Sequence, residues 1–260
     1  MSALAAGHAL RDSATLLRRN LRHAQRYPAM TYSVVLMPLL MLLLFTYVYG
    51  GALEEGIGGG TYIDYIAPGI ILMAATAGAV TTAVSVCVDM TEGIVNRFRS
   101  MAISRSAFLA GHVIGGVLQT LLAVVVVVVA ALLIGFRPDA TVPEWLAAAG
   151  LLVMLISGMT WISAAIGLIA KTPETASNIP MPLQFLPLIG SAIVPTASMP
   201  DGFRWFAENQ PFSPVIETLR GLLLGTPIGG SGVVALAWCT ALNLAGFLWA
   251  HHAFRRLTRR

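Results

Sequence analysis

Long apolar runs separated by short polar stretches make up most of this 260-residue chain. Several of these runs approach or exceed the roughly 18 residues that a helix needs to cross a lipid bilayer. The pattern predicts an all-α, polytopic membrane protein with six transmembrane helices in a single domain over residues 1–260. The membrane helices are expected at residues 31–49, 65–88, 107–134, 145–170, 179–195 and 232–252.

Two parts of the chain depart from this simple pattern. Residues 1–28 are predicted to form a cytoplasmic amphipathic helix at the membrane interface, because aliphatic residues share one side of a helical wheel and arginines the other. A basic segment that only holds the N-terminus inside would explain the same pattern. Pro180, Pro182, Pro187 and Pro195 break up the fifth apolar run, so an ordinary straight helix is not expected there. Residues 196–231 are also punctuated by prolines, and they are too long for a turn and too apolar for a solvated loop. We therefore expect outer re-entrant helices between the fifth and sixth membrane helices.

The distribution of basic residues predicts the orientation. Under this assignment 13 of the 16 Lys and Arg residues lie on one side of the membrane. The other three, Arg137, Arg204 and Arg220, lie on the opposite side. Because cytoplasmic loops carry the excess of Lys and Arg, both termini are expected in the cytoplasm.

Composition excludes several classes of protein. With 57% hydrophobic and 11% charged residues, the chain falls well below the roughly 25% charged residues of a soluble domain, so the lipid bilayer is its expected solvent. Its arginines lie at the ends of apolar runs and form no patch with interleaved aromatics, which argues against nucleic acid as a partner. The single lysine, Lys171, is not preceded by the glycine of a phosphate-binding loop. No metal and no cofactor are expected.

An intramembrane enzyme is one alternative, and it would need at least two catalytic groups close together at one membrane depth. The sequence indicates no such pair. Residues 229–232 match the GxSG motif of rhomboid proteases, but His251 and His252 follow Ser231 by about 30 Å along the same helix. His112, Gln119 and Asn243 are predicted to face protein or a water-lined path, with helix packing as the favoured role.

The predicted inner loop at residues 89–105 mixes acidic and basic side chains. Asp89 and Glu92 lie three residues apart, while Arg97 and Arg99 fall elsewhere on a helical wheel. This arrangement predicts a docking element for a partner protein, with a solvated mixed-charge turn as the alternative.

Four stretches of the sequence resemble the type-2 ABC exporter permeases of the daunorubicin/doxorubicin-resistance kind. They are DMTEGIVNRFRSMAISR at 89–105, KTPETA at 171–176, FLPLIGSAIVP at 185–195 followed by Met199-Pro200, and ENQPFSPVIETLRGLLLG at 208–225. The resemblance implies a six-helix permease of the bacterial cytoplasmic membrane that pairs with two copies of a separate ABC ATP-binding subunit. It also implies a homodimer, or a heterodimer with a similar permease. The cargo would be a hydrophobic or amphipathic drug, secondary metabolite or lipid.

The resemblance further implies roles for particular residues. The coupling loop to the ATPase subunit would comprise Asp89, Glu92, Gly93, Arg97, Arg99 and Arg105, with Glu92 as the main contact. The outer gate would comprise Pro187, Pro195, Pro200, Pro211 and Pro214. The chain itself would not be an enzyme, because ATP hydrolysis would belong to the separate subunit. An ATP-independent membrane channel or structural scaffold is the alternative, and it would show no partner-dependent ATPase response.

Overall fold

The computed structural model describes residues 28–54, 60–91 and 105–259. Within these ranges the regular structure is helical, with no strand. Most of the expected amphipathic helix, residues 1–27, lies outside the described residues. Four coupling-loop residues also lie outside them, so their predicted role stays a prediction: Glu92, Gly93, Arg97 and Arg99.

Five helical segments of the described chain are long and apolar enough to cross a membrane. The first is a continuous stretch made of α2 (Pro28–Leu43), the π-helical turn η1 (Leu44–Tyr49) and α3 (Gly50–Leu53). The others are α4 (Tyr62–Thr91), α6 (Arg105–Ile134), α7 (Val142–Ile169) and α12 (Ser231–Arg259). Each overlaps one of the predicted membrane helices, which confirms an all-α polytopic membrane protein.

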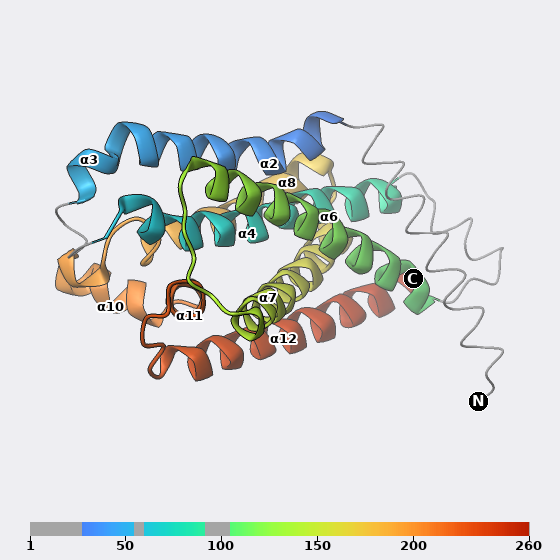
Figure 1. Cartoon of the computed structure of the whole chain (residues 1–260). Coiled ribbons are helices and arrows are strands. Elements are labelled where there is room, and N and C mark those ends of the chain that lie inside the picture. The colour runs from blue at the N-terminus through green and yellow to red at the C-terminus, as the bar shows by residue number, and fades with distance from the viewer. Residues whose placement is uncertain (1–27, 55–59, 92–104, 260) are drawn as a thin grey trace.

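Helix α4 is the central element of the bundle, and it packs against α2, α6, α7, α8 and α11 (Figure 1). In its most apolar part, α4 has most of its residues buried inside the bundle. In the corresponding parts of α6 and α12, fewer than a third of the residues are buried. Apolar side chains therefore cover the outside of the bundle, as Leu122 and Leu133 on α6 and Leu248 on α12 illustrate. Exposed apolar surface of this extent is expected where lipid is the solvent.

Glycines allow the helices to approach closely around α4. A Cβ atom added at Gly78 would overlap the hydroxyl of Thr120 on α6. One added at Gly116 would lie 2.5 Å from the hydroxyl oxygen of Thr82 on α4. Contacts between small residues are the usual way in which membrane helices pack when no water is present to drive them together.

The fifth predicted membrane helix, at 179–195, is not one helix. The chain instead forms α8 (Pro173–Asn178), α9 (Met181–Phe185) and the 3₁₀ turn η3 (Leu186–Ile189). The physical reason is the series of prolines, each of which removes a backbone donor and clashes with the preceding turn. A broken course was predicted from these prolines, and the structure confirms it.

This broken stretch nevertheless runs along α4 for most of its length. Near its start, Ala176 packs in a buried cluster with Ala83 and Cys87. Near its end, the carbonyl oxygen of Ile193 accepts a hydrogen bond from the Tyr62 hydroxyl at 3.1 Å. That this stretch forms a sixth membrane crossing stays a prediction. Its path along α4, which is itself long enough to cross a membrane, supports that prediction.

The two ends of the bundle differ in structure. We call the end where α4 and α12 begin the loop end, and the end where they finish the terminal end. The short helices η4 (Thr196–Ser198), α10 (Asp201–Asn209) and α11 (Phe212–Leu224) lie at the loop end (Figure 1). Helix α11 stops at Gly225, whose φ of 68° is a left-handed conformation that glycine adopts without strain. Helices between the fifth stretch and α12 are present as predicted, and their re-entry into the membrane stays a prediction.

Candidate functional site: a polar cluster at the terminal end

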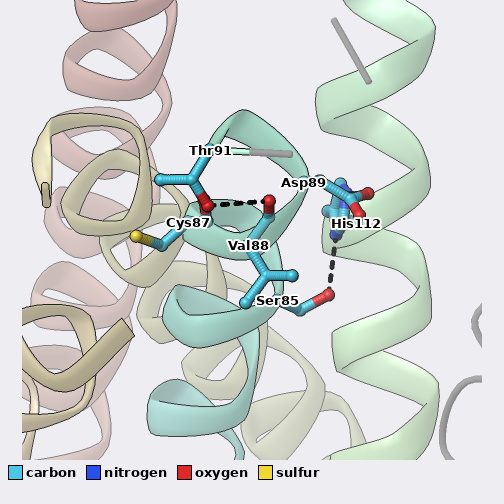
Figure 2. Close-up of polar contacts among 6 residues, drawn as sticks. All are labelled: Ser85, Cys87, Val88, Asp89, Thr91 and His112. Carbon is cyan, nitrogen blue, oxygen red and sulfur yellow. Dashed lines mark hydrogen bonds and ion pairs between the residues drawn. The ribbon is translucent and has the colours of Figure 1, made fainter. Parts of the chain in front are cut away.

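A polar cluster joins the last turns of α4 to the start of α6 (Figure 2). Nε2 of His112 lies 3.0 Å from Oδ2 of Asp89, and Nδ1 of the same ring lies 3.4 Å from Oγ of Ser85. Asp89 is 5% exposed and His112 is 7% exposed. One imidazole on α6 therefore bridges two polar side chains on α4.

Helix periodicity explains why these side chains meet. Ser85 and Asp89 are four residues apart and so lie on the same face of α4. The ring of Phe108 lies edge-on to His112 with centroids 4.7 Å apart, and it stacks on Phe254 of α12 at 5.8 Å. The polar contact is thus enclosed by aromatic packing that also includes α12. Buried polar groups in such surroundings depend on each other for hydrogen bonds.

Serine, histidine and aspartate together invite comparison with a hydrolase triad. Ser85 lies inside α4, six residues before its last residue, where the surrounding backbone N–H groups are engaged by the helix. An oxyanion would need free N–H donors beside the nucleophile. The arrangement therefore favours a structural link between two helices over acyl transfer.

Sequence reasoning missed this cluster, because it did not predict that Asp89 and His112 lie within hydrogen-bonding distance of each other. The two residues lie on either side of residues 92–104 in the sequence, and the antiparallel course of α4 and α6 brings them to one depth. A signal was available, because an ionisable residue in an apolar helix needs a polar partner. Two such residues at the facing ends of consecutive apolar segments are candidates for each other.

The terminus of α4 is also stabilised locally. Oγ1 of Thr91 donates to the carbonyl oxygens of Cys87 and Val88, each at 3.0 Å (Figure 2). These two bonds tie the Thr91 side chain back onto the preceding turn of its own helix. The described part of α4 ends at Thr91, and the next described residue, Arg105, is the first of α6.

The remaining predicted site residues fall in different places. Asp89, predicted for the coupling loop, faces α6 from within the bundle. Asn243 donates from Nδ2 to the carbonyl oxygens of Met154 on α7 at 2.7 Å and of Cys239 at 2.8 Å, a contact that suits helix packing. Gln119 is half-buried on α6, seven residues after His112. A place for these residues along a transport path stays a prediction.

The five prolines of the predicted outer gate gather at the loop end. They occupy η3, the residues just before η4, α10 and α11, and the first turn of α11: Pro187, Pro195, Pro200, Pro211 and Pro214. Each therefore begins or interrupts a short helix. In the described ranges, no three His, Cys, Asp or Glu side chains lie together as metal ligands would.

Comparison with known proteins agrees with this architecture. The sequence model of the family described as ABC-2 type transporter matches residues 12–224. The daunorubicin resistance ABC transporter permease protein DrrB1 of Streptomyces coeruleorubidus is 33% identical over 241 residues, which cover 89% of this chain and 82% of the relative. The probable doxorubicin resistance ABC transporter permease protein DrrC of Mycobacterium tuberculosis is 23% identical, over 88% of this chain and 83% of its own.

A putative transport permease, ycf38 of Porphyra purpurea, is 25% identical over 88% of this chain and 80% of its own length. Each of these relatives is matched over most of its own length and most of this chain. An ABC permease works with an ATP-binding partner and is a transporter component, not an enzyme. Together with its bundle of long apolar helices, these matches show that the chain belongs to the ABC-2 type transporter family, as the transmembrane permease subunit of an ABC exporter.

Proposed function

We propose that this permease moves a hydrophobic or amphipathic compound, such as a drug, a secondary metabolite or a lipid, out across the bacterial cytoplasmic membrane. The observation that carries the proposal is its 33% identity, along 89% of the chain, to a permease named for daunorubicin resistance. The second relative is named for doxorubicin resistance. Both names refer to resistance to a drug, so a drug is one of the proposed cargo classes.

Energy would come from two copies of a separate ATP-binding subunit. The single lysine of this chain, Lys171, lies exposed in the turn between α7 and α8, with no phosphate-binding glycine loop before it. The subunit would dock on the predicted coupling loop at residues 89–105, whose first three residues are the last of α4 and whose last residue is the first of α6. Movement of that loop would reach both helices at once, because Asp89 and His112 tie their ends together at 3.0 Å.

The terminal end would face the cytoplasm. Arg255, Arg256 and Arg259 lie in the last turns of α12, and Lys171 lies in the turn after α7. The loop end carries fewer basic residues, and cytoplasmic segments are the ones enriched in Lys and Arg. Both termini would then lie inside the cell.

Export would follow alternating access between two permease copies, either identical or paired with a similar chain. In that scheme, closure of the ATP-binding subunits would rock the copies and open a path between them toward the outside. The proline-rich short helices at the loop end would form the outer gate, since irregular backbone at membrane depth is tolerated where protein or water surrounds it.

Exposed aromatics on α10 fit the same location. Phe203 and Trp205 are 64% and 69% exposed, and Phe206 is 41% exposed. Aromatic side chains of this kind anchor helices at the boundary between headgroups and hydrocarbon. Anchoring is their favoured role, and release of an amphipathic cargo there is the alternative.

Co-purification tests the proposal directly. The permease is expressed with its candidate ATP-binding subunit, extracted in detergent, and assayed for ATP hydrolysis. We expect a stable complex for the unchanged chain and loss of assembly or ATPase stimulation for Glu92→Arg, because a reversed charge would repel the partner surface. Arg204→Glu is the matched control, since it reverses an exposed charge at the opposite end of the bundle.

The outcomes separate the proposal from its alternative. If the permease associates with no ATP-binding subunit and alters no ATPase rate, the exporter proposal fails and an ATP-independent channel or scaffold takes its place. If Glu92→Arg and Arg204→Glu weaken assembly equally, the coupling role of Glu92 is wrong even when the complex exists.

A further inference from the structure

Arg220 on α11 connects three segments that are far apart in the sequence. Its Nη2 donates to the carbonyl oxygen of Ser191 at 2.8 Å and to that of Tyr65 at 3.2 Å. Its guanidinium carbon also lies 3.9 Å from the centroid of the Tyr65 ring. One half-buried cation therefore contacts α4, α11 and the irregular backbone that follows η3.

The same irregular backbone is held on α4 by further hydrogen bonds. The Tyr65 hydroxyl donates to the Ser191 carbonyl oxygen at 3.1 Å, and the Tyr62 hydroxyl donates to that of Ile193 at 3.1 Å. Between these two anchors, a Cβ atom added at Gly69 would lie 2.7 Å from Cβ of Ala192. Residues 190–195 form no helix of their own, so their buried carbonyl groups depend on side chains for partners.

Arg220 supplies the strongest of these contacts. A hydrogen bond from a charged donor is stronger than one between neutral groups, and the face of an aromatic ring adds a cation–π attraction. The described contacts of this guanidinium are carbonyl oxygens and a ring face. The cation therefore holds backbone in place at the loop end.

The contact is surrounded by buried polar atoms that lack partners. Arg220 Nε, Ser191 Oγ and Gln210 Oε1 have no hydrogen-bond partner within the described residues. Gln210 is 4% exposed and Ser191 is 2% exposed. Nε2 of Gln210 donates to Oγ of Ser213 at 3.3 Å, and that oxygen accepts from the Ser191 backbone at 3.3 Å.

Unpartnered buried polar atoms raise the free energy of the conformation that contains them. Water that entered between α11 and the backbone at 190–195 would form hydrogen bonds with all three of these atoms. These new hydrogen bonds would offset part of the free energy needed to separate the two segments. Once the Arg220 contact breaks, the loop end can therefore separate here at low cost.

We propose that Arg220 is a positioning residue that holds residues 191–193 against α4 and keeps the loop end closed. Breaking its two carbonyl hydrogen bonds opens this end to water during the transport cycle. The first statement concerns the resting protein alone, and the second rests on the proposed export function.

Cysteine reactivity at position 191 tests the first statement. Ser191→Cys is close to isosteric, and Ser191 Oγ has no partner to lose within the described residues. The probe is made with Cys87 and Cys239 replaced by alanine, and its rate of reaction with N-ethylmaleimide is measured on the purified permease in detergent. Arg220→Met should raise this rate about tenfold or more, the change expected when a charge-assisted hydrogen bond is lost.

Three further variants test whether the increase in reaction rate depends on the contacts of Arg220. Arg220→Lys keeps the charge but loses the planar fork, so we expect a smaller increase. Tyr65→Phe keeps the ring and removes one bond to the Ser191 carbonyl, so we expect a small increase as well. Arg204→Met removes an exposed arginine that pairs with Glu208 at the same end, and it should leave the rate unchanged.

Two results would overturn the proposal. The first is an unchanged rate at position 191 in Arg220→Met, or in Arg220→Lys where the methionine variant cannot be purified. The second is measured in the chain that keeps Ser191 and both native cysteines. An equal rise in the reactivity of Cys87 and Cys239, both 0% exposed, on the change Arg220→Met would mean general loosening of the fold.

The gating statement has its own measurement. In the complex with the ATP-binding subunit, trapping with ATP and vanadate should raise the reaction rate of the Ser191→Cys thiol, and an unchanged rate contradicts gating by Arg220. If no complex forms, the export proposal fails. The rates measured on the permease alone still decide whether Arg220 holds the loop end closed.

Discussion

The carboxylate of Asp89 lies 3.0 Å from Nε2 of His112, and so links the finish of α4 to the start of α6. The loop predicted to contact the ATP-binding subunit leaves α4 after Thr91 and enters α6 at Arg105. A force applied to that loop would therefore act on two helices that are already tied together. Because α4 is the central helix, the link leads into the core of the bundle.

Loss of the histidine should destabilise the bundle. His112→Leu leaves the Asp89 carboxyl buried without this partner, and we expect a loss of about 1–3 kcal/mol in the free energy of unfolding. Denaturant unfolding of the purified permease in detergent would measure it. Ser85→Ala is the control, with a loss below about 1 kcal/mol, because its contact is 3.4 Å long. Equal losses for the two variants would contradict a dominant Asp89–His112 contact.

Glycine substitutions should have opposite effects at two helical positions. Gly78→Ala places a methyl group on Thr120, and we expect it to destabilise the protein by about 1–3 kcal/mol through overpacking. Gly150→Ala on α7 has nothing within 4 Å of the added atom and should stabilise by about 0.5–1 kcal/mol, since alanine favours helix. Thermal unfolding of both variants checks the pair. A stabilised Gly78→Ala would show that α4 and α6 are not packed this closely.

The long helices could be predicted from sequence because a bilayer sets a minimum length for an apolar run. Predicted ends differ by a few residues, as at α4, which was expected over 65–88 and extends over Tyr62–Thr91. Polar residues at helix ends lower mean hydropathy without ending the helix. Hydropathy locates a crossing, and capping groups decide where the helix stops.

The sequence did not predict which distant segments contact each other. Prolines indicate where the helix at 179–195 must break, but not how the resulting pieces run along α4. The depth at which His112 meets Asp89 depends on how two helices align across a loop. Arg220 was counted only as an outer basic residue, because no local pattern reveals that its partners are the carbonyls of Tyr65 and Ser191.

The N-terminus of α8 makes a pH-dependent contact. A hydrogen bond from its own backbone N–H, together with the Thr172 side chain, lowers the pKa of Glu174 below its ordinary value of 4.5. A carboxyl whose pKa is lowered by folding stabilises the folded state above its ordinary pKa. That contribution disappears as the pH falls through the lowered value. Thr172→Ala should therefore raise the pKa of Glu174 toward 4.5.

Carbon-detected NMR of the permease with labelled glutamate would measure this titration. Glu174→Gln identifies the resonance by removing it. The distant capping box formed by Thr141 and Glu144 on α7 offers a matched control, since Thr141→Ala should leave the Glu174 titration unchanged. If Thr172→Ala also leaves the titration of Glu174 unchanged, the Thr172 side chain does not lower the pKa of Glu174.

The crossing made of short helices has a direct test. Lys171 and Ser198 flank this stretch, and both are exposed. Single cysteines at these positions, without Cys87 and Cys239, would be labelled in intact cells with a membrane-impermeant maleimide. We expect Ser198→Cys to react in intact cells and Lys171→Cys to react only after permeabilisation, because the stretch between them runs along most of α4. Reaction of both cysteines from the same side would mean that the stretch does not cross. Both the outer gate and the cytoplasmic placement of the two termini would then have to be abandoned, since five crossings put the ends of the chain on opposite sides.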